Sequence, residues 1–279
     1  MTEPVAGAGS EGAPDPATRF LTVITVCRNA RAALERTAAS VLPQLAPDVE
    51  YLVVDGASTD DTRGLLGRLA SQGVRVVSEP DQGIADAMNK GVRLARAEWV
   101  AHLHAGDIYL PHTIGSVREQ AARSDADVLC GWQWKQETAG ETLYRADPDR
   151  LPCGMTVNHP AAFVRREWFE RCGGFDLGFP NAMDYEFFLR LYRAGARFRV
   201  IEEPLARMAG GGQSERSLWL TATECREIRR RHGASPWHRS QAYFAWTVAR
   251  GLARRALQCG GLGSLVDWYR RRFAWPAKG

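Results

Sequence analysis

The chain has 279 residues, 45% of them hydrophobic and 24% charged, which is enough to bury the core of one α/β domain with an appendage. Its six cysteines form no CxxC pair and no zinc-finger spacing, which favours reduced thiols in a cytoplasmic protein over a disulfide framework. The net charge of +4 divides unevenly: residues 1–213 carry −5 and residues 214–279 carry +9, so a mildly acidic body has a basic end.

Residues 1–18 are rich in Gly, Ala, Pro and Glu, and we expect them to be disordered. The following stretch alternates four apolar runs with three helical patterns, which predicts βαβ units and a mainly parallel sheet. We expect Asn29 to cap the first helix, and Ser58, Thr59 or Asp60 to cap the second. The expected strands are 20–26, 50–55, 74–78 and 99–103, and the expected helices are about 30–42, from the 58–60 caps to 73, and 84–97.

An aspartate follows each of three successive strands: Asp55, Asp81 and Asp107. Taken singly, each fits a turn or capping residue as well as a ligand contact. Because ligands bind outside the carboxyl ends of parallel strands, we expect the three carboxylates to cluster at one edge of the sheet. The turn at Gly106-Asp107 can present a carboxylate to a hard divalent cation beside a diphosphate. The chain contains neither GxGxxG nor GxxxxGK[ST], so a nucleotide would be held by side chains and a metal.

The second half predicts fewer regular elements, with breaks at several glycines. The expected elements are a helix at about 111–123, a strand at 127–134 that can pair with 142–145, an irregular stretch at 146–162, helices at 165–172 and 181–193, a strand at 197–202, a flexible loop at 209–213 and further helices to the end. His102 and His104 share a strand face, but a metal site there lacks a third soft ligand in the nearby sequence. His159 is a site candidate in the irregular stretch. Asp184 alone fits an acidic residue favoured by a helix N-terminus.

Taken together, the motifs resemble the family-2 glycosyltransferases with the GT-A fold, a Rossmann-like mixed sheet flanked by helices. The likeness spans about 21–214, and its closest form is the bacterial exopolysaccharide or O-antigen type. The segments that carry it occur in the order 22–29, 54–62, 79–91, 103–107, 159–166, 173–176, 182–190 and 211–214. It implies a nucleotide-binding half at 19–110, an acceptor half at 111–213 and a basic helical extension at 214–279.

The resemblance also implies roles on the donor side. Asp55 and Asp81 would hold the nucleoside, with a further contact from Thr25. Gly106 would contact the donor, and Asp107 would be the last residue of the metal-binding DxD motif. Because residues 104–107 read His-Ala-Gly-Asp, only one aspartate remains to bind Mg²⁺ or Mn²⁺.

On the acceptor side, the resemblance makes Asp184 the catalytic base, and we place His159 in the acceptor or phosphate region. Arg207 and the glycines 210–212 are expected to form a loop that closes over the diphosphate, since glycines permit the backbone change and arginine suits phosphate geometry.

The implied activity is inverting, metal-dependent transfer of a sugar from a nucleotide-diphosphate sugar to an acceptor hydroxyl, in bacterial surface-polysaccharide or glycoconjugate synthesis. The acceptor would be a glycan or a lipid-linked glycan, and we expect no nucleic-acid partner. A non-catalytic binding subunit with the same fold is the alternative, and the retained Asp107 and Asp184 count against it.

Residues 236–279 interleave aromatic side chains with arginines. Aromatic residues favour the headgroup level, and basic residues favour anionic lipid. No stretch reaches the roughly 18 apolar residues of a membrane span, and we identify no signal peptide. We therefore expect peripheral contact with the inner face of the membrane. The alternative is that these helices pack on the domain or on a second copy in a homodimer.

Overall fold

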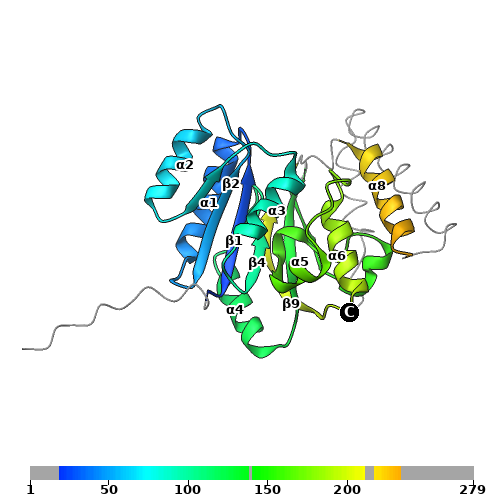
Figure 1. Ribbon diagram of the computed structural model, residues 1–279. Helices are drawn as coiled ribbons and strands as arrows, with labels where there is room; N and C mark the ends of the chain where they lie inside the picture. The colour runs from blue at the N-terminus through cyan, green and yellow to red at the C-terminus, as the bar shows by residue number, and fades with distance from the viewer. Residues whose placement is uncertain (1–18, 138–139, 211–216, 234–279) are drawn as a thin grey trace, which may run out of the picture.

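The computed structural model describes residues 19–137, 140–210 and 217–233. Within these ranges the chain forms one curled mixed sheet with helices on both faces (Figure 1). None of the described helices is long and apolar enough to cross a membrane. The predictions for residues 1–18, 211–213 and 236–279 lie outside the described residues.

The described sheet has two parts with different strand directions. In the first, β3 (Arg75–Ser78), β2 (Val49–Asp55), β1 (Leu21–Cys27) and β4 (Trp99–His102) are parallel, in that order. The order continues through β8 (Ala162–Arg165), β6 (Val128–Glu137), β9 (Phe198–Met208) and β5 (Ile108–Tyr109), while β7 (Gly140–Tyr144) pairs with β6. Strand β8 is antiparallel to both β4 and β6, and β5 is antiparallel to β9, whereas β6 and β9 are parallel.

Two hydrophobic cores cover the two faces of this sheet. Every residue of β1 and β2 is buried, as expected for parallel strands covered on both sides. On one face pack α3 (Ile84–Leu94), α5 (Glu167–Cys172) and α6 (Met183–Arg193); α8 (Leu218–Arg231) lies beside α6 at the end of the molecule (Figure 1). On the other face pack α1 (Arg31–Val41), α2 (Thr62–Ser71) and α4 (Thr113–Arg123). Short 3₁₀ turns occupy Leu42–Gln44, Pro148–Cys153 and His159–Ala161.

The predicted elements occur in the predicted order, with β5 and β8 as additional strands, and several boundaries differ. Helix α3 ends at Leu94 rather than at 97, and Ile84 at its start is exposed. Strand β8 lies between β4 and β6, whereas the sequence predicted an irregular stretch at 146–162 and a helix from 165. Strand β9 runs to Met208 instead of ending at 202, because its pairing with β6 continues across an irregularity between Gly131 and Gln133.

The predicted cap of α1 is wrong. Asn29 has φ +48°, and its side-chain oxygen accepts the N–H of Thr59 at 2.8 Å instead of an N–H of α1. The N–H of Ala30, which precedes α1, donates to the hydroxyl of Thr62 at 3.0 Å. Asn29 therefore joins the loop after β1 to the loop after β2. Asp60 does accept the N–H of Thr62 at the start of α2, at 2.9 Å.

Candidate active site

The strand-end aspartates lie at one edge of the sheet, as predicted. Asp55 is in register with Cys27 on β1 and with Ser78 on β3, so the loops after these strands leave the sheet at the same level. The turn that contains Asp107 follows β4 at this edge. Because β8 runs antiparallel to β4, His159, just before β8, comes to the same edge.

Asp55 is fully buried and its carboxylate is occupied by hydrogen bonds. One oxygen accepts the Ser58 N–H at 2.9 Å and the Ser78 hydroxyl at 2.6 Å. The other accepts the Ser58 hydroxyl and, at 3.7 Å, the Cys27 thiol. Since a carboxylate offers about four acceptor positions, these four donors fill it. In this conformation Asp55 shapes the turn after β2, and a contact with a nucleoside requires one of the donors to move.

Asp81 lies in the loop after β3 and is half-buried. One of its oxygens accepts the Gly83 N–H at 2.9 Å. The other lies against Gly56: a Cβ at that glycine would sit 2.1 Å from the Asp81 oxygen and 3.3 Å from Cδ of Arg28. The loops after β1, β2 and β3 therefore meet at Gly56, with the exposed Arg28 and the Asp81 carboxylate on either side of it.

Thr25 lies inside the protein, and its nucleoside contact stays a prediction. Thr25 lies two residues before the end of β1 and has no exposed surface. Its hydroxyl donates to the Leu103 carbonyl at 2.8 Å and shares a hydrogen bond with the Tyr51 hydroxyl at 3.1 Å. Its side chain therefore supports the end of β4 from inside the protein.

Residues 104–107 form a tight turn that helix α1 holds in place. The Asp107 N–H donates to the His104 carbonyl at 3.0 Å. The buried Thr37 hydroxyl of α1 accepts the Gly106 N–H at 2.9 Å and donates to the Asp107 carbonyl at 2.7 Å. Gly106 has φ +109°, a conformation that side chains disfavour. The turn that presents Asp107 therefore depends on both a glycine and a threonine distant in sequence.

Asp107 is 6% exposed, and only one of its two carboxylate oxygens accepts a hydrogen bond from the described residues. The first oxygen accepts the Ala209 N–H at 2.8 Å, and the second has no hydrogen-bond partner among the described residues. Burial raises the pKa of Asp107 to about 7, against the lowering effects of the Ala209 N–H and the Lys135 charge. A buried carboxylate with a free oxygen is a suitable ligand for a hard cation.

The surrounding residues fit a divalent cation only when a donor is present. Within the described ranges, no group of three or more His, Cys, Asp or Glu side chains is arranged to hold a metal. Mg²⁺ is commonly bound by one or two carboxylates together with substrate phosphates and water. Asp107 can supply the protein ligand in such an arrangement, and a donor diphosphate would supply the others.

Three histidines gather beside the 104–107 turn. The His159 ring lies 5.0 Å from the His104 ring and 5.8 Å from the His102 ring, and Phe175 packs edge-on against His102 at 5.1 Å. Burial lowers the pKa of His104 to about 3 and that of His159 to about 4, and it also lowers the pKa of His102 well below its usual value. The three rings are therefore neutral at physiological pH and form an uncharged wall. His159 is 8% exposed, and its Nε2 has no hydrogen-bond partner in the described part of the chain.

Asp184 lies in the first turn of α6 and is half-buried. One of its oxygens accepts the Tyr185 N–H at 2.7 Å. Burial raises the pKa of Asp184, while the nearby His104 ring lowers it, and Asp184 in turn raises the pKa of His104. Asp184 therefore lies within electrostatic range of His104, in the turn that ends in Asp107. A carboxylate with a raised pKa is suited to accept a proton near neutral pH.

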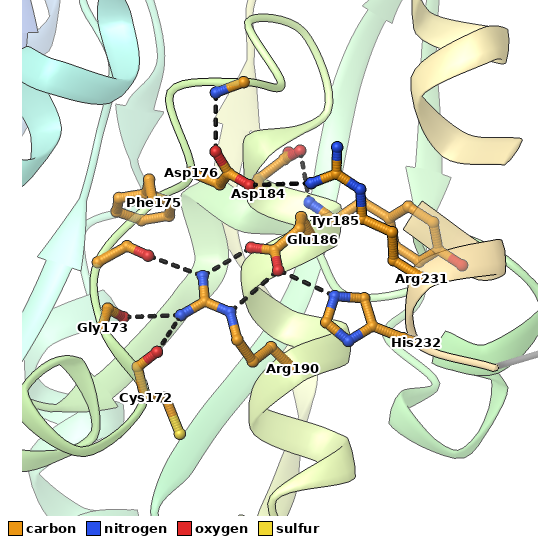
Figure 2. Close-up of polar contacts among 12 residues, drawn as sticks. Cys172, Gly173, Phe175, Asp176, Asp184, Tyr185, Glu186, Arg190, Arg231 and His232 are labelled. Carbon is orange, nitrogen blue, oxygen red and sulfur yellow. Dashed lines mark hydrogen bonds and ion pairs between the residues drawn. The ribbon is translucent and has the colours of Figure 1, made fainter. Parts of the chain in front are cut away.

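An ion-pair network holds α6 to its neighbours (Figure 2). Glu186, which is 4% exposed, accepts two hydrogen bonds from the Arg190 guanidinium at 3.0 and 2.6 Å and pairs with His232 at 2.9 Å. Arg190 also donates to the carbonyls of residues 172–174. From α3, Asn89 exchanges two hydrogen bonds with the Phe175 backbone at 2.8 and 2.7 Å. The loop before α6 is therefore fixed on both sides.

Arg207 belongs to a strand rather than to a loop. It lies in β9 in register with Ile108 of β5, and its guanidinium pairs with Glu141 of β7 at 2.6 Å. Ala209, two residues later, donates its N–H to Asp107 as described above. The residue just before Gly210 is therefore bound to the candidate metal ligand. The donor role of Arg207 stays a prediction.

Sequence reasoning missed two residues beside Asp107. Thr37 lies on the buried face of α1 with Leu34, Ala38 and Val41, and a polar residue on a predicted apolar face was the available signal. Lys135 of β6 acts on the Asp107 carboxylate, but no sequence pattern links these positions.

Comparison with known proteins identifies the family. The model of the family described as glycosyl transferase family 2 matches residues 22–196. PGL/p-HBAD biosynthesis glycosyltransferases of Mycobacterium bovis and Mycobacterium tuberculosis are 30% identical over 178 residues, covering 62% of this chain and 70% of theirs. Chondroitin synthase of Escherichia coli is 27% identical over 170 residues, 57% of this chain and 24% of that protein.

Solved structures show the same fold at low identity. TarS of S. aureus in complex with UDP-GlcNAc superposes with a TM-score of 0.66 at 16% identity, over 82% of this chain and 71% of that one. The mannosyltransferase PcManGT of Pyrobaculum calidifontis, in complex with GDP-Man and Mn²⁺, gives 0.64 at 18% identity over 96% and 84%. The chain therefore belongs to glycosyl transferase family 2, has the GT-A fold and is a glycosyltransferase.

Proposed function

We propose that this enzyme transfers a sugar from a nucleotide-diphosphate donor to an acceptor hydroxyl with inversion at the anomeric carbon, assisted by a divalent cation. The observation that carries the proposal is that Asp184, from the second half of the chain, lies within electrostatic range of the turn that presents the buried Asp107. Asp107 follows β4, Asp184 begins α6, and His104 of the same turn as Asp107 interacts electrostatically with Asp184.

On the donor side, Asp107 would hold Mg²⁺ or Mn²⁺ through its free carboxylate oxygen, together with oxygens of the diphosphate. A divalent cation at this position supplies neutralisation of the charge that develops on the departing nucleotide. Gly106 keeps the backbone close to the donor, and the loops that carry Asp55 and Asp81 would surround the nucleoside. Arg207 would approach the diphosphate.

On the acceptor side, Asp184 would accept the proton of the attacking hydroxyl. Its position in the first turn of α6 fixes the carboxylate, and burial keeps it basic enough to act near neutral pH. The neutral rings of His104 and His159 do not compete for the proton. Attack opposite the departing diphosphate inverts the anomeric centre.

The relatives suggest the class of acceptor. Two relatives are named for PGL/p-HBAD biosynthesis and for chondroitin synthesis. A glycan or lipid-linked glycan acceptor is compatible with both names. Such an acceptor also fits a cytoplasmic enzyme whose residues 236–279 contact the inner face of the membrane. The alternatives for these residues remain packing on the domain or a homodimer.

The donor side can be tested with Asp107→Asn, which keeps the shape of the side chain and its hydrogen bond from Ala209. We expect turnover to fall at least about 100-fold, because stabilisation of the leaving group by a metal contributes several kcal/mol. The variant should also lose the enhancement of nucleotide binding by Mn²⁺ in calorimetry. Asp61→Asn is the matched control, since Asp61 is exposed and pairs only with Arg31 at 3.5 Å among the described residues. Full turnover in EDTA, or unchanged Mn²⁺-dependent binding by Asp107→Asn, would refute the metal role.

A further inference from the structure

Helix α6, which carries Asp184, begins without a local cap. Ala182 occupies the cap position and makes no side-chain cap hydrogen bond; within the first turn, Asp184 accepts the Tyr185 N–H. The side chain of the preceding Asn181 makes no hydrogen bond within the described part of the chain. Backbone N–H groups at a helix start need partners from elsewhere, because the helix itself supplies none.

Glu224 of α8 binds the two backbone N–H groups that lead into α6, from more than 40 residues away in the sequence. One of its carboxylate oxygens accepts the N–H of Asn181 at 3.0 Å and the N–H of Ala182 at 2.8 Å. Glu224 is 6% exposed, which is unusual for a glutamate on a helix that also faces solvent. Because one oxygen accepts both N–H groups, the reach of the Glu224 side chain fixes the two residues relative to α8.

Helix α8 is anchored well enough to act as a support. Ile228, one turn after Glu224, is fully buried in the core that α6 lines. At the end of α8, Arg193 donates to the carbonyls of His232 and Gly233 at 2.7 and 2.6 Å. The neighbouring Arg231 pairs with Asp176 at 3.5 Å, and His232 pairs with Glu186 (Figure 2). The Glu224 carboxylate therefore projects from a helix held along the flank of α6.

We propose that Glu224 is a positioning residue for Asp184: by holding the two residues that lead into α6, it fixes the direction in which the Asp184 carboxylate points. The inference rests on the proposed role of Asp184 as the base. Displacement of a reacting group by about 1 Å can cost about 100-fold in rate, so a support outside the reacting centre can matter for turnover.

Three substitutions in the full chain distinguish the contributions of the acceptor oxygen, the charge and the reach of the Glu224 side chain. Glu224→Ala removes the acceptor oxygen, Glu224→Asp keeps the charge but shortens the reach, and Glu224→Gln keeps the reach and the acceptor oxygen but removes the charge. Glu227→Gln is the matched control, because Glu227 lies on the same helix and pairs with Arg230 and Arg231 near the surface. Each variant is assayed for kcat, donor KM and melting temperature.

We expect Glu224→Ala and Glu224→Asp to lower kcat by about 10-fold to 100-fold with donor KM within about twofold, and Glu224→Gln to recover most of that loss. Unchanged kcat in Glu224→Ala and Glu224→Asp would overturn the inference. So would a kcat that follows the charge, with Glu224→Asp active and Glu224→Gln impaired, or a loss in melting temperature with no loss of kcat per folded molecule. Asp184→Asn is measured in parallel: if it keeps its turnover, the proposed base and this inference both fail, whereas its inactivation beside a fully active Glu224→Ala refutes the inference alone.

Discussion

Asp184→Asn should remove activity without weakening the fold. The amide oxygen can still accept the Tyr185 N–H that Asp184 accepts at 2.7 Å, so the start of α6 keeps its geometry. Only the basicity is lost. A positioned general base typically contributes about 10²–10⁴-fold to the rate, which corresponds to about 3 to 5 kcal/mol of transition-state stabilisation. We expect kcat to fall within that range while the donor KM changes little.

The stability of the same variant should change in the opposite direction. Burial raises the pKa of Asp184 above 3.8 in the folded protein, so folding favours the protonated carboxyl group. The stability gained from this preference is fully present below the unfolded value and is lost as the pH rises through the folded value. At neutral pH the wild-type protein therefore carries the cost of a buried charge, and Asp184→Asn does not. The variant should melt at an equal or higher temperature at neutral pH, and the difference should vanish below pH 3.8.

The assay combines initial rates at saturating donor and acceptor over a range of pH with calorimetric melting. Wild-type turnover should rise with pH through the raised pKa of Asp184, and this rise should be absent in the variant. Glu186→Gln is the contrast two residues along the same helix: it breaks a buried pair with Arg190 and His232, so it should lower the melting temperature while keeping most of its turnover per folded molecule. An Asp184→Asn enzyme that retains more than about a tenth of wild-type kcat, or that loses stability together with activity, contradicts the assignment.

Two further predictions concern packing and the C-terminal residues. A Cβ at Gly91 of α3 would lie 2.5 Å from Cγ2 of Ile24 in β1, so Gly91→Ala should destabilise by about 1–3 kcal/mol, whereas Gly64→Ala, with no atom within 4 Å of its Cβ, should stabilise by about 0.5–1 kcal/mol. Urea unfolding checks both, and equal effects would contradict the contact. The full chain should float with anionic liposomes at low salt and release at high salt, while a chain ending near Gly233 should not; if both stay unbound, residues 236–279 do not contact lipid.

The sequence predicts the donor half of this fold well, because its pattern there is local. Each parallel strand is a short apolar run, each helix has its own periodicity, and the loops after β2, β3 and β4 each carry an aspartate. Strands β1 to β4 lie within a few residues of their predicted positions, and the loops with Asp55 and Asp81 meet at Gly56 as the strand order requires.

The acceptor half is less predictable, because its elements depend on distant partners. The four residues of β8 become a strand only through pairing with β4 on one side and β6 on the other. The polar part of β9, with Pro204 inside it, would not be identified as a strand without β6 beside it. Asn29 failed as a cap for a related reason: local propensity favoured a helix cap, whereas its hydrogen bond with Thr59 determines its position.

The positions of the two candidate catalytic carboxylates follow the same division. Two hydrogen bonds fix the position of Asp107: one from the Thr37 hydroxyl of α1 to its carbonyl, and one from the Ala209 N–H after β9 to its carboxylate. Asp184 is set by the start of α6, which Glu224 of α8 holds. A family pattern over residues 22–196 contains both carboxylates but ends before Ala209 and Glu224. The residues that carry the chemistry are thus recognisable from motifs, while part of the support that orients them comes from outside the matched segment and becomes visible only in the folded chain.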